Sequence, residues 1–91
     1  MRKISLNEET QLFNIDILDA TTNLLICIYK IKDQFAYRYL SCEQSKGHMY
    51  DPITLSKKFD WANGPYSSPQ QARREAKKYY LEFLTNSVIK I

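Results

Sequence analysis

The residues of this chain that could do nucleophilic or metal chemistry gather between residues 41 and 52. Cys42, Ser45, His48 and Asp51 follow one another there, and a cysteine or serine beside a histidine is the arrangement that activates a nucleophile. The stretch has no apolar periodicity, so it predicts an exposed loop that gives these side chains no rigid support. Cys42 and His48 also supply only two of the four ligands that structural zinc requires. We therefore expect no catalytic residue, no metal site and no cofactor.

Two further patterns that enzymes use are missing from the sequence. The carboxylates are scattered, and no two of them are spaced for acid and base roles. The only glycines, Gly47 and Gly64, cannot form a glycine-rich phosphate cradle. The sequence thus favours a protein that is not an enzyme.

A second group of residues is suited to binding phosphates. Four cations lie within one predicted helix, on the face opposite its apolar stripe: Arg73, Arg74, Lys77 and Lys78. Three more lie on predicted strands: Arg38, Lys57 and Lys58. If the two groups converge, they form an electrostatic footprint for nucleic acid. The simpler interpretation is the solvated face that every amphipathic helix needs, and both interpretations remain open.

The elements that position these residues follow from hydrophobic periodicity. Alternating apolar side chains predict strands over residues 12–18, 24–31, 35–40 and 53–59, the last of them an edge strand. A helix beginning at Ser5 competes with the first strand. Residues with turn chemistry predict turns over 19–23, 32–34 and 61–65.

The best-defined element is a helix over residues 69–84. Ser68 is a favourable N-cap, Pro69 suits the first helical position, and Gln71 completes a capping box. Apolar residues then recur at spacings of three and four, and those expected to face the sheet are Ala72, Ala76, Tyr80 and Phe83.

Together these elements predict a single domain over residues 1–91 of the α+β class. We expect an antiparallel three- to four-stranded meander with one C-terminal helix packed on one face. Its parts are an N-terminal segment at 1–10, a sheet at 11–60 with the 41–52 loop, the helix at 68–85, and a tail or short strand at 86–91.

One helix covers only one face of a sheet, yet the strand over residues 24–31 is apolar on both faces. Ile26 and Ile28 therefore need another cover, either the N-terminal segment or a second copy of the chain. Because exposed apolar patches usually mark interfaces, the sequence predicts an interface at Ile26, Ile28 and Leu40, through which two copies can form a homodimer.

Length and composition limit the class of protein and its compartment. A chain of 91 residues with 44% hydrophobic and 25% charged residues is one ordinary globular domain, which excludes a multidomain enzyme. The net charge of +3 is only mildly basic. The longest apolar run, residues 24–29, is far below the roughly 20 residues of a membrane helix, and no signal-peptide core follows Lys3. With two cysteines and no disulfide framework, we expect a cytoplasmic protein with no membrane partner.

The order of elements in the second half of the chain resembles a known family. A strand at 35–40, a strand at 53–59, and a Gly-x-aromatic-x-Ser turn from Gly64 into a helix containing Ala72 are similar to the arm-type DNA-binding domains of tyrosine integrases. The likeness covers residues 35–83. It implies a three-stranded sheet laid in a major groove with the helix behind it, and Arg38, Lys57 and Lys58 as the matching sheet cations.

The sequence therefore supports two functions of different classes. The first is a small noncatalytic cytoplasmic interaction module that binds a protein partner through its open sheet face, a second copy of itself included. The alternative is a nucleic-acid-binding domain that uses the sheet and helix cations.

Overall fold

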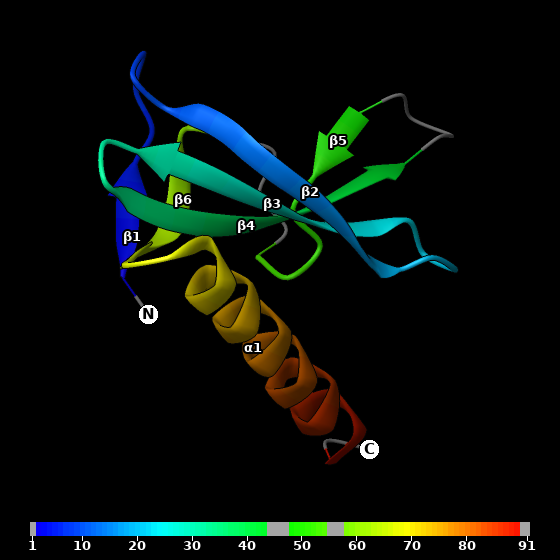
Figure 1. Cartoon of the computed structure of the whole chain (residues 1–91). Coiled ribbons are helices and arrows are strands. Elements are labelled where there is room, and N and C mark those ends of the chain that lie inside the picture. Colours follow the sequence, from blue (N-terminus) through cyan, green and yellow to red (C-terminus); the bar gives the residue numbers. More distant parts are fainter. Residues whose placement is uncertain (1, 44–47, 55–57, 90–91) are drawn as a thin grey trace.

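The computed structural model describes residues 2–43, 48–54 and 58–89, and within them the chain forms six strands and one helix (Figure 1). The strands are β1 (Lys3–Ser5), β2 (Gln11–Asp19), β3 (Leu24–Ile31), β4 (Gln34–Glu43), β5 (His48–Tyr50) and β6 (Trp61–Tyr66), and the helix is α1 (Pro69–Ile89). The strands pair antiparallel in the order β1-β6-β4-β3-β2, and β5 pairs with the far end of β4. Helix α1 packs against one face of this sheet. The predicted α+β class is confirmed, and the meander β2-β3-β4 is widened by β6 and β1.

The two turns of the meander form as the sequence predicts. Asp19 Oδ1 accepts hydrogen bonds from the backbone N–H of Thr21 at 3.0 Å and from its hydroxyl at 2.6 Å. Asn23 then adopts a positive φ of 53°, which its short polar side chain tolerates. The second turn consists of two residues, because Ile31 pairs with Gln34, and its first residue also has a positive φ, as tight hairpin turns require.

The predicted strand at 53–59 is wrong where the structure describes it. Residues 52–54 form a turn, residues 58–60 are not in a strand, and residues 55–57 lie outside the described residues. The cause is Asp51, whose Oδ1 accepts the backbone N–H groups of Ile53 at 3.0 Å and Thr54 at 3.2 Å. A carboxylate that accepts the backbone N–H groups two and three residues later holds the chain in a turn, and those N–H groups can no longer donate to a neighbouring strand.

The turn predicted at 61–65 is instead strand β6, which lies between β1 and β4. The close packing of β6 against β4 explains why position 64 is a glycine. A Cβ at this position would lie 3.0 Å from the carbonyl oxygen of Phe35 and 3.1 Å from the Cβ of Ala36. The glycine is therefore needed for the close approach of β6 to β4, not for a turn.

The predicted 41–52 loop is largely a hairpin. Strand β4 continues to Glu43, and β5 pairs with it through Ser41 opposite Tyr50, Cys42 opposite Met49 and Glu43 opposite His48. Residues 44–47 lie outside the described residues. The change of composition after residue 40 therefore marks a second, shorter hairpin at the end of the sheet.

Both ends of the chain differ from the prediction. The N-terminal segment forms β1, which pairs with β6 at one sheet edge and does not cover β3. At the other end, residues 86–89 extend α1 in place of a tail or strand, and residues 90–91 lie outside the described part. The helix continues because no glycine or proline interrupts it.

The core lies between α1 and the β3–β4 part of the sheet. Its fully buried members are Leu24, Ile26, Ile28, Tyr37, Tyr39, Ala72 and Ala76. Ile26 and Ile28 have no exposed surface, so the prediction that they form an open interface is wrong. The alternation in the sequence separates the two faces of β3 correctly, but the face that carries Ile26 and Ile28 is the one that α1 covers.

Hydrogen bonds within its first turn and one long-range hydrogen bond from β4 fix the start and the position of α1. Ser68 Oγ accepts the backbone N–H of Gln71 at 3.1 Å, which confirms the predicted N-cap. The Gln71 side chain reaches Ser67 instead of Ser68, accepting its N–H at 3.0 Å and its hydroxyl at 2.8 Å. Farther along the helix, the Tyr39 hydroxyl donates to the carbonyl of Ala76 at 2.5 Å. The small side chains of Ala72 and Ala76, both buried, allow this close approach of α1 to β4.

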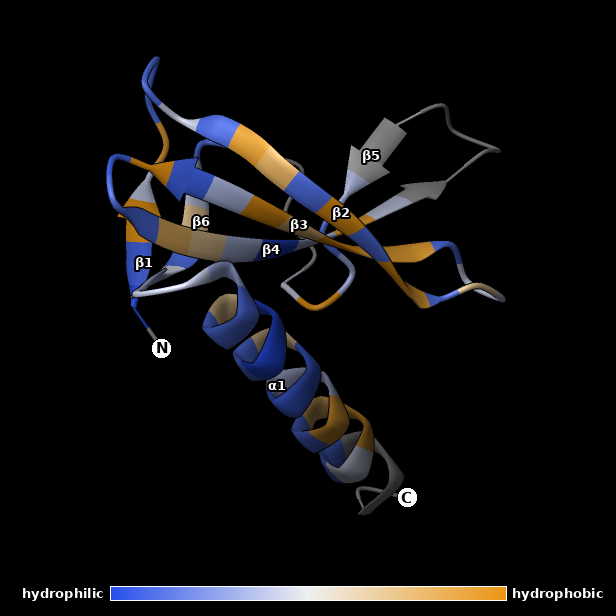
Figure 2. Ribbon diagram, viewed as in Figure 1, coloured by the Kyte–Doolittle hydropathy of each residue, from blue (hydrophilic) through white to orange (hydrophobic). Residues whose placement is uncertain are grey.

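The second half of α1 runs past the sheet (Figure 1). Phe83 is 36% exposed and Leu81 is 63% exposed, and apolar colour reappears on this end of the helix in Figure 2. Phe83 is therefore not the buried core residue that the stripe predicts, although Tyr80 packs against the core.

Candidate interaction surfaces

The sheet face away from α1 carries a row of apolar side chains. Cross-strand register places Ile17 opposite Leu25 and Leu25 opposite Leu40, so the three share one face across β2, β3 and β4. Leu12 and Ile15 lie on the same face of β2, opposite Tyr29 and Cys27. We call this surface the open face: Leu12, Ile15, Ile17, Leu25 and Leu40. Its three β2 residues are exposed, Ile17 by 70%, Leu12 by 54% and Ile15 by 47%.

A register irregularity between Leu12 and Asn14 decides which β2 side chains reach the open face. The alternation in the sequence groups Phe13 with Ile15 and Ile17. In the structure the ring of Phe13 meets the edge of Phe35, with centroids 5.3 Å apart, and Phe35 packs on the core under α1. Leu12 therefore replaces Phe13 on the open face. Of the three predicted interface residues, Leu40 alone lies there.

Strand β2 also forms one edge of the sheet. Its nine residues include no lysine and no proline, two residues that commonly protect an edge from pairing with another chain, although β2 does carry Asp16, Asp19 and two register irregularities. The opposite edge is β1, which has three residues and carries Lys3. Among the described residues, the β2 edge therefore offers the longer row of unpaired backbone groups, and the exposed residues of the open face lie on the same strand.

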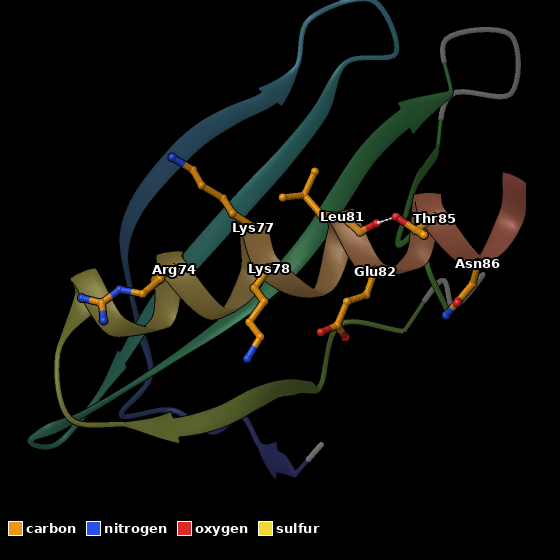
Figure 3. A pocket seen from close by; sticks show the side chains of 7 residues that line it. All are labelled: Arg74, Lys77, Lys78, Leu81, Glu82, Thr85 and Asn86. Carbon is orange, nitrogen blue, oxygen red and sulfur yellow. Dashed lines mark hydrogen bonds between the residues drawn. The ribbon is translucent and has the colours of Figure 1, made fainter. Parts of the chain in front are cut away.

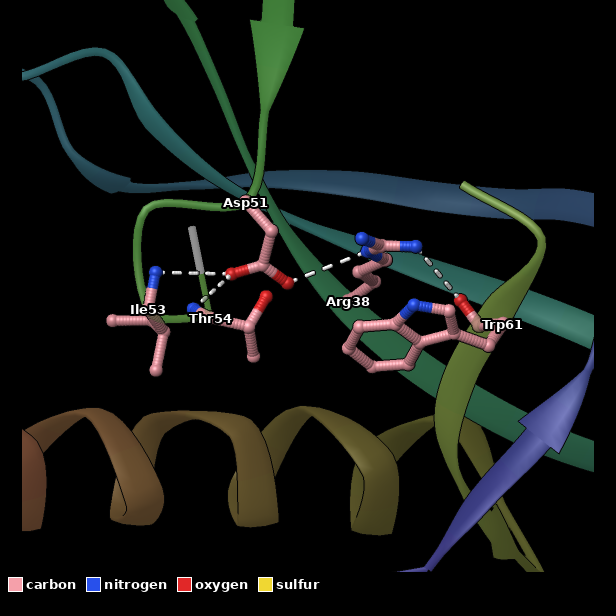
Figure 4. Close-up of polar contacts among 5 residues, drawn as sticks. All are labelled: Arg38, Asp51, Ile53, Thr54 and Trp61. Carbon is pink, nitrogen blue, oxygen red and sulfur yellow. Dashed lines mark hydrogen bonds and ion pairs between the residues drawn. The ribbon is translucent and has the colours of Figure 1, made fainter. Parts of the chain in front are cut away.

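The β6 end of the same face is closed by a buried cation. Arg38 has no exposed surface, and its guanidinium lies 4.1 Å from the ring centre of Phe59 and 3.9 Å from that of Trp61. Its Nε donates to Asp51 Oδ2 at 3.3 Å, and Nη1 donates to the Trp61 carbonyl at 3.2 Å (Figure 4). Among the described residues, Nη2 has no hydrogen-bond partner.

This enclosure removes Arg38 from any phosphate-binding surface, so its prediction as a nucleic-acid contact is wrong. Burial lowers the pKa of the Arg38 guanidinium, while the Asp51 carboxylate acts to raise it. The guanidinium contacts one carboxylate, one carbonyl and two aromatic faces, which is the environment of a structural ion pair. Sequence alternation placed Arg38 opposite Tyr37 and Tyr39 correctly, but nothing local showed that residues 13 to 23 positions away would cover it.

The structure describes five of the six remaining predicted cations. Arg73 is paired with Asp16 of β2, Lys58 is exposed, and Lys57 lies outside the described residues. Arg74, Lys77 and Lys78 are exposed on the outer side of α1. Because Arg38 lies on the sheet face away from the helix, it does not converge with the helix cations as the nucleic-acid prediction requires.

The exposed helix cations line a shallow surface along α1. It is bounded by Arg74, Lys77, Lys78, Leu81, Glu82, Thr85 and Asn86, all from this one helix (Figure 3). Three cations and one carboxylate give it a net positive charge, and Leu81 adds an apolar contact. It can hold an extended anion by charge alone.

The residues singled out for nucleophilic chemistry do not assemble into a described site. Asp51 is buried and bound to Arg38, Ser45 lies outside the described residues, and the side chains of Cys42 and His48 are not described. Burial raises the pKa of the Cys27 thiol, which makes this buried free cysteine a weak nucleophile. Across the part of the chain that the structure describes, no group of three potential metal ligands occurs.

A cavity of about 240 Å³ lies where α1 leaves the sheet. Its lining comes from the second half of α1, the β2–β3 turn, strands β3, β4 and β5, and the segment after β5: Thr22, Leu24, Ser41, Tyr50, Pro52, Ile53, Tyr80, Phe83 and Leu84. Ser41 Oγ donates to the Thr22 carbonyl at 3.2 Å at its rim. Phe83 thus lies at the wall of a cavity and not in close-packed core.

Comparisons with protein-family models, with curated proteins and with solved structures give no match for this chain. Within residues 2–43, 48–54 and 58–89, no helix is long and apolar enough to cross a membrane. Function must therefore be argued from the surfaces themselves.

Proposed function

We propose that this protein is a noncatalytic interaction module that binds a protein partner in extended conformation along β2 and the open face. The observation that supports it is that β2, a nine-residue strand with a described neighbour on one side only, carries the exposed Ile15 and Ile17. Strand addition of this kind obtains affinity from main-chain hydrogen bonds and specificity from alternate side chains.

The apolar row gives the partner a defined place. Ile17, Leu25 and Leu40 run across three strands next to the edge, so a strand added beside β2 extends the row with its own apolar side chains. Toward β6, Arg38 and the rings over it close the face. The partner is therefore confined to the β2 side of the sheet.

We assign this activity to the cytoplasm. The assignment is supported by the buried free thiol of Cys27, which a reducing compartment preserves.

Ile17→Lys tests the proposal, with Leu81→Lys as its matched control. Both side chains are about two-thirds exposed, so a lysine is tolerated by the fold at either place, but only Ile17 lies on the β2 edge. Nuclease-treated lysate is passed over immobilised wild type and both variants, and captured proteins are quantified. We expect Ile17→Lys to lose the partners that Leu81→Lys retains. Identical capture by the two variants would contradict the proposal.

A second candidate, binding of nucleic acid, is favoured by the exposed cations on the outer side of α1. Arg74, Lys77 and Lys78 lie side by side along the helix (Figure 3). This candidate rests on the helix cations alone, because the resemblance to arm-type DNA-binding domains implies binding through the sheet, with the helix behind it.

Salt dependence tests it. Three phosphate contacts give a slope of log affinity against log salt of about −3 for duplex DNA. Lys77→Gln should flatten this slope by about 1, whereas Lys30→Gln, a matched exposed lysine on β3, should leave it unchanged. Absence of binding to labelled duplex and single strands at low salt would eliminate this candidate.

A further inference from the structure

We propose that the partner of β2 is a second copy of this chain, and that two β2 strands pair antiparallel about a two-fold axis centred on Ile15. This inference rests on the proposed function, because it names the occupant of the same edge. It follows from the edge, from symmetry and from the charges that each possible register brings together.

Symmetry restricts the registers. Two identical strands that extend one sheet antiparallel are related by a two-fold axis normal to the sheet, which keeps each face on its own side. Residues that come opposite each other must then share a face, so the axis passes through one residue of β2. Register irregularities between Leu12 and Asn14 and between Ile17 and Asp19 leave residues 14–17 as the regular stretch on which the axis can lie.

Charge then selects the centre. With the axis at Ile15, Asn14 of each copy lies opposite Asp16 of the other, and the amide can donate to the carboxylate twice across the pair. Within one chain Asn14 Nδ2 already donates to Asp16 Oδ1 at 3.3 Å, so the two groups are oriented on the same face. With the axis at Asp16, two carboxylates oppose each other, which is destabilising.

The remaining two centres are less favourable. An axis at Asn14 or at Ile17 brings an irregularity of each copy into the first pairs beside the axis, next to Phe13 in the one case and Leu18 in the other. Centred on Ile15, the first pairs on both sides are regular. The register at Ile15 therefore combines regular backbone, complementary polar pairs and no opposed like charges.

The paired dimer also covers exposed apolar surface. Ile15, 47% exposed, meets Ile15 of the second copy on the open face. Both α1 helices lie on the same side of the continuous sheet, and Arg73, paired with Asp16, adds a cation beside each polar pair. The two open faces join into one apolar strip on the other side.

Disulfide trapping tests the register. Directly opposite residues in an antiparallel pair have Cα atoms about 4.5 to 5.5 Å apart, a separation that a disulfide spans. Ile15→Cys should therefore give a covalent dimer on mild oxidation at micromolar concentration. In the Asn14→Cys variant or the Asp16→Cys variant alone, the Cα atoms of the two introduced cysteines are about 8 Å apart across the dimer. Each variant should therefore yield at least tenfold less covalent dimer than Ile15→Cys. An equimolar mixture of the two variants should cross-link, because position 14 of one copy then lies opposite position 16 of the other.

Wild type, with Cys27 and Cys42, measures the background, and circular dichroism establishes that each variant is folded. Efficient cross-linking of Asp16→Cys in place of Ile15→Cys, or equal cross-linking by all three variants, would overturn the register. A folded Ile15→Cys variant that stays monomeric would overturn the pairing itself.

The proposed function is separated from this inference by sedimentation. Wild type is sedimented at about 100 micromolar, a concentration at which a dimer with a dissociation constant in the micromolar range is largely associated. If wild type is a monomer there while Ile17→Lys still loses its captured partner, self-pairing is wrong and strand addition to another protein stands. If the Ile17→Lys and Leu81→Lys variants match wild type in both measurements, both proposals fail.

Discussion

The buried pair of Arg38 and Asp51 makes the sharpest prediction about what stabilises this fold. Both side chains have no exposed surface, so removing one partner leaves a charge without compensation in the interior. Asp51→Asn removes the charge but keeps a side-chain oxygen for the N–H groups of Ile53 and Thr54. It therefore isolates the ion pair from the turn.

We expect Asp51→Asn to lower the free energy of unfolding by about 3 to 5 kcal/mol, the cost of breaking a buried ion pair. This is a large share of the roughly 5 to 15 kcal/mol of a small domain. Asp51→Ala should cost about 1 to 2 kcal/mol more, because the turn N–H groups lose their acceptor. The double variant with Arg38→Met should be more stable than Asp51→Asn alone, since a well-packed apolar residue can replace a buried pair with little loss.

Urea titrations followed by fluorescence of Trp61 measure these differences. Trp61 is the only tryptophan and lies 3.9 Å from the Arg38 guanidinium, so its emission reports this site directly. A cost below about 1 kcal/mol for Asp51→Asn, or additive costs in the double variant, would refute the reasoning. Either outcome would mean that the guanidinium is compensated by the aromatic faces and not by the carboxylate.

Three further predictions concern the helix, the core and a tyrosine of β3. Phe83→Ala should lower the free energy of unfolding by about 1 to 2 kcal/mol, and Ile28→Ala by about 2 to 5 kcal/mol. The difference is expected because Phe83 is 36% exposed at a cavity wall, whereas Ile28 is fully buried. Urea titrations compare the two variants. Ser68→Ala should cost about 0.5 to 2 kcal/mol through loss of the N-cap, measured as a lower urea midpoint. Burial raises the pKa of Tyr29 to about 12, so the folded chain holds this proton more tightly than the unfolded chain. Stability is then full below pH 10 and falls as the pH rises toward 12, by up to about 1.4 kcal/mol per pH unit for this tyrosine, and Tyr29→Phe should remove that part of the slope.

The meander and the helix were predictable because their signals are local. Alternation over β2, β3 and β4, the turn chemistry at Asp19 and Asn23, and the cap at Ser68 each act within a few residues. Strand β6 was not predictable in this way. Its Asn-Gly-Pro sequence carries turn chemistry, and only the approach to Phe35 and Ala36 of β4 shows why the glycine is there.

Local patterns also separate the two faces of β3 without showing which one is covered. Ile26 and Ile28 were assigned to an interface because the sequence does not state on which side a helix will pack. The decisive contacts join β4 to α1 across 37 residues, as in the bond from the Tyr39 hydroxyl to Ala76. Among the predicted interface residues, only Leu40 lies on the face away from α1, and its part in an interface stays a prediction.

The sheet face away from α1 is covered by side chains near β6 and exposed near β2. Near β6, the chain closes the face with Phe59 and Trp61 over Arg38, and the ion pair with Asp51 fixes the segment that follows β5. Near β2 no described element crosses the face, and Ile15 and Ile17 stay exposed beside an unpaired edge. A second helix over this half would make the domain self-sufficient, whereas an added strand uses the open backbone groups and the apolar row together. For this reason we propose strand addition at β2 as the association that this surface makes.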